Sequence, residues 1–271
     1  MRKWFDFTVV IAAIAVGWMF TTRVQDTELK KVDFGFDDFI IAPVRVHLLR
    51  APDGHSAGCQ LKGADVDRIF RKANGIWHKA GIHLWIESIV DEQSDIDAMR
   101  KSEKSANPEV LLPLRPKSSL AASLFHVYYI GDMPPNGIYI RRDGIFVKES
   151  ALLRKVDGGI DEPLPRVTAH ELGHAMGLPH RQDTTNLLAS GTTGTLLNEA
   201  EIALARRTAR LNDWIVTVKD FIEVTEKLAV AEPKVALQRY KSVSDIPGKS
   251  IMKEKVIAAI ATLLVSQPKK P

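Results

Sequence analysis

The chain has 271 residues, of which 45% are hydrophobic and 26% are charged, and its formal net charge is +4. This length and composition suit one large or two small globular domains and exclude a disordered or collagen-like chain. The single cysteine, Cys59, excludes an intramolecular disulfide, and the scattered Lys and Arg residues predict a solvated surface and no nucleic-acid partner.

The first 22 residues have the pattern of an export segment. Arg2 and Lys3 precede an apolar run over residues 7–20, and polar threonines follow it. Such a run predicts either a cleaved signal peptide or an uncleaved signal anchor, and bulky residues at its end favour the anchor. Both alternatives predict an extracytoplasmic protein, either secreted or held by a single membrane pass with its N-terminus in the cytoplasm.

The segment after the export sequence predicts a strand, a helix and a second strand. Residues 23–42 have mixed charge and predict a linker. Alternating apolar residues predict a strand over 43–49, and apolar residues at helical spacing predict a helix over 64–81. A second strand follows over 82–90. This order of elements predicts a parallel or mixed sheet with a backing helix.

The middle of the chain predicts further strands and one helix that carries a polar motif. Residues 91–119 are polar and predict a long surface segment with one short helix over 95–104. Strands are predicted over 123–130 and on both sides of the turn at 142–144. A helix is predicted over 164–176, because its prolines are confined to the first turn. Everything from residue 43 to residue 211 is therefore predicted to form one domain.

The last part of the chain, residues 212–271, differs in its pattern. Two apolar stripes at helical spacing are separated by a short polar linker. They predict a helical C-terminal extension whose stripes form core.

Three of the chain's 8 histidines fall within one short window. His170 and His174 project from the same face of a helix, so that their ring nitrogens can share a divalent ion at about 2.0–2.1 Å. Glu171 is rotated by about 100° from His170, which places its carboxylate beside the ion, where a general base takes a proton from water. Gly177 can end the helix, and the chain then returns His180 as a third ligand.

Three protein ligands distinguish between two kinds of zinc site. Structural sites are normally closed by four protein ligands, whereas catalytic sites keep one position open for water. The sequence therefore predicts a catalytic Zn²⁺ site with Glu171 as the catalytic residue. The remaining histidines have no ligand-like spacing and are expected to be ordinary core or surface residues: His47, His55, His78, His83 and His126.

The string from His170 to His180, HELGHAMGLPH, resembles the signature of the metzincin clan of zinc metalloendopeptidases. The later stretch TTNLLASGTTGTLLNEAEIALARR resembles the continuation found in matrixins. This resemblance covers residues 43–211 and implies an α+β (α/β-like) fold with a mixed twisted sheet, a backing helix and a zinc-bearing helix. Leu188 stands where the family has the methionine of its Met-turn, and we expect an apolar side chain of similar volume to preserve zinc binding.

The predicted activity is hydrolysis of peptide bonds by a metalloprotease. Glu171 would act as the general base on a metal-activated water, and the substrate would be a peptide or protein in an extended conformation. The resemblance implies that an edge strand from residues 139–148 pairs with this substrate. Two alternatives remain: a membrane-tethered, zinc-stabilised binding module without catalysis, and a zinc hydrolase of a non-peptide amide. The sequence gives no indication of the oligomeric state.

Overall fold

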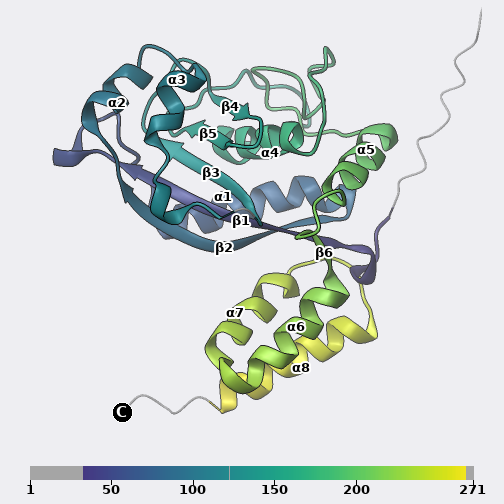
Figure 1. Cartoon of the computed structure of the whole chain (residues 1–271). Coiled ribbons are helices and arrows are strands. Elements are labelled where there is room, and N and C mark those ends of the chain that lie inside the picture. The colour runs from purple at the N-terminus through teal and green to yellow at the C-terminus, as the bar shows by residue number, and fades with distance from the viewer. Residues whose placement is uncertain (1–32, 122, 267–271) are drawn as a thin grey trace, which may run out of the picture. The chain divides into compact units, whose positions relative to one another are not determined.

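The computed structural model describes residues 33–121 and 123–266 (Figure 1). The predicted export segment lies outside the described residues. No helix in the described part of the chain is long and apolar enough to cross a membrane.

The strands are β1 (Ile40–Arg50), β2 (Ile82–Gln93), β3 (Phe125–Ile130), β4 (Gly137–Ile140), β5 (Gly144–Lys148) and β6 (Val216–Thr217). The α-helices are α1 (Gly63–Trp77), α2 (Ile96–Ser102), α3 (Pro108–Leu111), α4 (Pro163–Ala175), α5 (Glu199–Ala209), α6 (Val218–Ala231), α7 (Pro233–Ser244) and α8 (Ile251–Val265). Short 3-10 helices are η1 (Phe36–Asp38), η2 (Pro52–Gly54), η3 (His78–Ala80), η4 (Leu112–Leu114) and η5 (Lys117–Ser119).

The strands form a mixed sheet, as predicted. Its order is β2-β1-β3-β5-β4, and β6 pairs with the start of β1. In this order β2, β1, β3 and β5 run parallel to one another. β4 runs antiparallel to β5 and forms one edge of the sheet. Parallel neighbours require crossover connections, which α1 provides between β1 and β2.

β1 begins earlier than the sequence predicts. It includes Ile40 and Ile41, which the sequence pattern assigned to a linker, and these residues pair with β6. Both side chains are almost completely buried. The start of the strand is paired on both sides, because Ile40 and Ile41 pair with the beginning of β2 as well as with residues 216–217 of β6.

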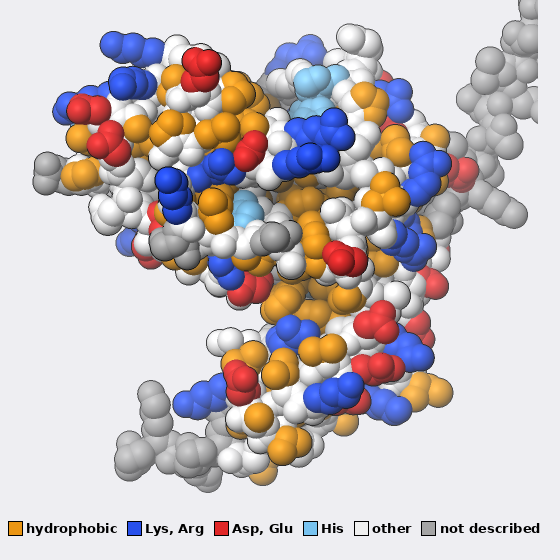
Figure 2. Space-filling model, in the orientation of Figure 1, with side chains coloured by type: hydrophobic (Ala, Val, Ile, Leu, Met, Phe, Trp, Pro, Cys, Tyr) orange, Lys and Arg blue, Asp and Glu red, His pale blue; other side chains and the backbone are white. Residues whose placement is uncertain are grey.

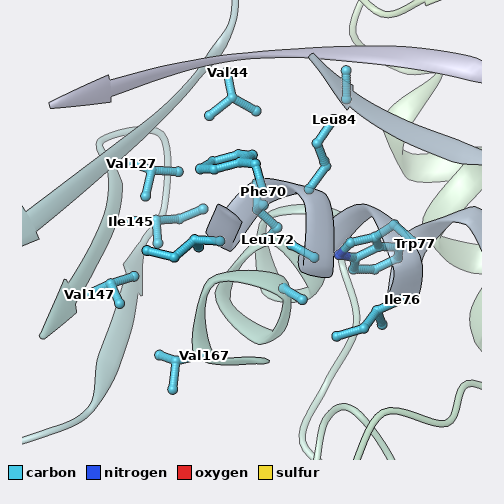
Figure 3. Close-up of a cluster of buried hydrophobic side chains, with 14 of the residues drawn as sticks. Val44, Phe70, Ile76, Trp77, Leu84, Val127, Ile145, Val147, Val167 and Leu172 are labelled. Carbon is cyan, nitrogen blue, oxygen red and sulfur yellow. The ribbon is translucent and has the colours of Figure 1, made fainter. Parts of the chain in front are cut away.

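The two faces of the sheet pack against different helices. Ile40, Val44 and Leu48 face a large core that includes α1 and α4 (Figure 3). Ile41 faces a second core with α6, α7 and α8, and Leu49 faces a third with α2 and α3. Burial on both faces explains why β1 is apolar along most of its length.

The backing helix α1 is amphipathic, as its spacing predicts. It buries six side chains against the sheet: Val66, Ile69, Phe70, Ala73, Ile76 and Trp77. Gly81 follows η3 with a φ of 62°, which is the left-handed conformation that ends a helix. The chain then enters β2 directly, so that α1 and β2 form one continuous unit with β1.

The C-terminal helices are present as predicted, whereas the domain boundary at residue 211 stays a prediction. Phe221 and Tyr240 join Ile41 in the second core, and Val256 of α8 is buried there. The Arg239 guanidinium packs over the rings of Trp85 and Phe221, 4.6 and 4.0 Å from their centroids, and these two rings contact each other edge to face. These contacts attach α6 and α7 to β2.

The surface carries charges of both signs. Figure 2 shows Lys and Arg side chains scattered among acidic and apolar ones on the face that it presents. A cavity of about 980 Å³ lies between α1, β2 and α7, with Asn74, Trp85 and Arg239 in its lining. It adjoins β2, the edge of the sheet opposite to β4.

Candidate metal centre

α4 carries the histidine motif on a helix with defined ends. Pro163 and Pro165 occupy its first turn, where a missing N–H leaves no hydrogen bond unmade. Gly177 has a φ of 84°, and its N–H bonds to the carbonyl of His174 at 2.9 Å. The next N–H, that of Leu178, bonds to the carbonyl of Gly173, which completes a Schellman motif. This stop reverses the chain and returns His180 toward the helix.

The structure brings together the three histidines that the sequence predicts as ligands. One ring nitrogen from each of His170, His174 and His180 lies within 4.8 Å of the others. The Nε2 atom of His174 is 3.0 Å from that of His170 and 3.1 Å from that of His180. Two nitrogens bound to one tetrahedral zinc ion at about 2.0–2.1 Å lie roughly 3.3 Å apart, so the donor set fits such an ion.

Backbone carbonyls set the tautomers of two of these rings. His170 Nδ1 is 2.8 Å from the carbonyl of Leu187, and His174 Nδ1 is 2.7 Å from that of Leu178. Because a carbonyl only accepts, both Nδ1 atoms carry the proton. The Nε2 lone pairs then face one another at about 3 Å, an arrangement that a bound cation stabilises. Burial also lowers the pKa of His170 to about 3, which keeps the ring neutral and able to ligate.

Glu171 follows His170 directly in α4 and is not one of the three converging groups. Its side chain is buried against β4, where a Cβ atom on Gly137 would stand 2.7 Å from Glu171 Oε1. Burial raises the pKa of Glu171 to about 8, whereas the charge of Arg166 and the backbone of Tyr139 act in the opposite direction. The structure therefore places a buried carboxyl group between the histidine helix and the edge strand.

A tight turn lies under the histidine helix. The side chain of Asn186 accepts a hydrogen bond from the Leu188 N–H at 2.7 Å, and Leu188 is completely buried. A Cβ atom on Gly173 would lie 3.2 Å from Leu188 Cδ1. Leu188 is thus an apolar contact directly below α4, while the carbonyl of the preceding Leu187 supports His170.

A buried acid joins the segment after His180 to this turn and to α5. Glu201 is 1% exposed and accepts hydrogen bonds from Arg181 Nε at 2.6 Å and Asn186 Nδ2 at 2.8 Å. It also accepts from the N–H of Asn198, which completes a capping box at the start of α5. The same carboxylate therefore caps a helix and fixes the residue next to His180.

The other histidines lie apart from the metal-ligand cluster. His47 is buried and bonds to Glu92 at 3.0 Å and to His126 at 2.8 Å. His78 bonds to His83 at 2.9 Å. Within the described residues, neither pair belongs to a group of three converging metal ligands. That these rings are ordinary core or surface residues stays a prediction.

Sequence reasoning missed several contributors to the site. The carbonyls of Leu178 and Leu187 carry no sequence signal, because every residue has one. Gly137 is far from the motif in the chain. Arg166 could have been noticed, since it precedes His170 by four residues and therefore shares its helix face.

The chain is similar to known proteins in structure, while its sequence matches no known family. No family model matches the chain, and no curated protein matches it. The chain is similar to the crystal structure of archaemetzincin from Methanopyrus kandleri, with 14% identity and a TM-score of 0.41 over 62% of this chain and 96% of that one. It is also similar to the structure of a chaperone–substrate complex, with 12% identity and a TM-score of 0.37 over 66% of this chain and 35% of that one. Identities and TM-scores this low establish no function.

Proposed function

We propose that this protein is a zinc-dependent endopeptidase of the metzincin type. One observation carries the proposal: three imidazole rings converge, and Glu171, the residue directly after His170, is a buried acid that is not one of the converging groups. A structural zinc site normally takes a fourth protein ligand, and no such ligand converges here among the described residues. Three donors and a neighbouring acid are typical of a catalytic site.

His170, His174 and His180 would hold the ion through their Nε2 atoms. A bound zinc ion supplies Lewis acidity, which makes a water acidic and polarises a substrate carbonyl. The carbonyls of Leu187 and Leu178 keep two of the rings oriented for this task. We also propose Leu188 as the counterpart of the Met-turn methionine, because it provides the apolar floor under the helix.

Glu171 would act as the general base and then as the general acid. It would take a proton from the attacking water and pass it to the nitrogen of the leaving amine. A pKa raised by burial makes the carboxylate a better proton acceptor, and a neighbouring divalent cation would bring this pKa down again. The environment therefore suits a group that gains and loses a proton near neutral pH.

β4 supports a peptide as the substrate. Within the described residues it pairs only with β5, so its other edge is free to pair with an extended chain. Gly137 and Tyr139 of this strand adjoin Glu171, so a peptide added to the free edge would run close to the proposed base. A free strand edge is less useful for a small non-peptide amide.

The export segment supports an extracytoplasmic place for this activity. Residues 1–22 predict either membrane anchoring or secretion, and the two alternatives place the peptidase on the same side of the membrane.

The test uses the full chain and its Glu171→Gln variant. We expect bound zinc in both, fragments of an unfolded protein with the wild type only, and no fragments after chelation. Glu87→Gln on β2, at the opposite edge of the sheet, is the control and should cleave normally. A metal-loaded wild type that cleaves nothing would support the non-catalytic binding module, and a chain without transition metal would contradict both.

A further inference from the structure

Arg166 is a buried cation next to the candidate metal centre. It lies on α4 and is 2% exposed. Its Nε donates to the carbonyl of Gly194 at 3.2 Å, and its Nη2 donates to the carbonyl of Ala189. Its Nη1 lies 3.2 Å from His170 Nδ1. One guanidinium therefore binds both ends of the loop that follows Leu188 and lies against the ring of His170, to which it does not donate because Nδ1 carries a proton.

The contacts of Arg166 are unusual for a buried charge. No ion pair joins it to a carboxylate among the described residues, and its acceptors are neutral carbonyls. Glu171 is the acidic group that interacts electrostatically with Arg166, but no hydrogen bond joins them, and burying a cation in this way is costly. A proposed site for a divalent cation lies beside it, which adds repulsion. Stability of the fold alone does not favour a positive charge at this place.

The geometry points to Arg166 as a positioning residue for the metal centre. Its planar fork holds Ala189 against α4, and Ala189 lies two residues after Leu187, whose carbonyl orients His170. The link thus runs from Arg166 through the turn to the ring of His170. This inference rests on the proposed function for its metal, although it concerns the affinity and geometry of the site and not the cleavage step.

We expect the planar geometry of the Arg166 guanidinium, and not its charge, to support the metal centre. Lysine preserves the charge but presents one ammonium group, which does not reproduce two parallel hydrogen bonds in one plane. Methionine removes both the charge and the donors. If Arg166 acted only through its charge, Arg166→Lys would resemble the wild type and Arg166→Met would bind zinc more tightly, because a repulsive charge is gone.

Arg206 provides a matched control. It also donates from its guanidinium to backbone carbonyls, those of Ala80, Gly81 and Asp38. It lies on α5, and its hydrogen bonds and its contact with the Phe34 ring involve none of the three histidines. Arg206→Met should therefore reproduce the loss of carbonyl contacts and of stability without affecting the metal centre.

The experiment measures Zn²⁺ affinity by competition with a chromogenic chelator, at a temperature where each metal-free chain is folded. We expect Arg166→Lys and Arg166→Met to weaken zinc binding by about 10–100-fold, the usual effect of losing a residue that supports a ligand. Arg206→Met should bind as the wild type does. The visible spectrum of the Co²⁺-loaded protein should also change for both Arg166 variants and not for Arg206→Met. If Arg166→Met does not fold, Arg166→Lys decides.

Three results would overturn the inference. Wild-type zinc affinity in Arg166→Lys would show that the fork is unnecessary. Lowered thermal stability without a change in affinity or spectrum would give Arg166 the same role as Arg206. A wild-type chain that binds no Zn²⁺ would remove both this inference and the proposed function. By contrast, wild-type protein that binds zinc without cleaving peptides would contradict only the proposed function.

Discussion

Gly137 of β4 and Glu171 of α4 approach so closely that no side chain fits between them. A Cβ atom at residue 137 would lie 2.7 Å from Glu171 Oε1 and 2.6 Å from Val167 Cγ1. Gly137→Ala should therefore displace the carboxylate, and a displacement of about 1 Å costs about 100-fold in turnover. Zinc affinity should stay within a few-fold of the wild type, because the histidines are not contacted.

This prediction is checked by peptidase kinetics on metal-loaded protein. Gly75→Ala in α1 is the control, since a Cβ atom there meets nothing within 4 Å. Equal turnover in Gly137→Ala and the wild type would show that the position of Glu171 does not depend on this strand.

Leu188 is expected to tolerate methionine and not alanine. The two larger side chains have similar volumes, so Leu188→Met should change the free energy of unfolding by less than about 1.5 kcal/mol. Leu188→Ala leaves a cavity below α4 and should cost about 2–5 kcal/mol. Denaturant unfolding of the metal-free chain measures both, with Leu211→Ala, an exposed site, as the control. A small loss for Leu188→Ala would mean that the turn is not packed against the helix.

Glu201 should be important for the segment that presents His180. Glu201→Ala would leave Asn186 and the N–H of Asn198 without their acceptor. Loss of a buried hydrogen-bonded acid and of a helix cap predicts a destabilisation of about 2–4 kcal/mol. Zinc affinity should fall as well, because Arg181 follows His180 directly. Glu199→Ala, an exposed position in the same helix turn, should leave zinc affinity unchanged.

The buried histidines away from the metal centre predict loss of stability in acid. Burial lowers the pKa of His47 and of His78 to about 4 and that of His83 to about 3. In the unfolded chain these groups protonate near pH 6.5, so acid favours the unfolded state. Their contribution is full above pH 6.5 and declines as the pH falls toward 4, by about 1–2 kcal/mol for each group at pH 5.

Unfolding of the chelated protein between pH 5 and 8 measures this dependence, since metal release then plays no part. His83→Gln should flatten the curve if the ring of His83 is a main source of it. A free energy of unfolding that is constant over this range would contradict the assignment of neutral, buried rings.

Much of the candidate site could be predicted from the sequence because its determinants are local. The spacing of His170 and His174 places them on one helix face, and Gly177 ends that helix, so that a nearby His180 must return. The helix over 64–81 can be predicted for the same reason, since its period and its stop lie within one segment. Local geometry determines all of these features before the rest of the chain is considered.

Only the tertiary structure decided what surrounds these residues. The start of β1 at Ile40 lies between β2 and β6, which comes far later in the chain, and the tautomer of His170 depends on a carbonyl in the turn below it. Glu171 acquires its burial from β4, a strand that the sequence could not place beside it. Contacts of backbone carbonyls cannot be recognised in a single sequence, because every residue carries the same peptide group. Strand order cannot be recognised either, because pairing joins segments that are distant in the chain.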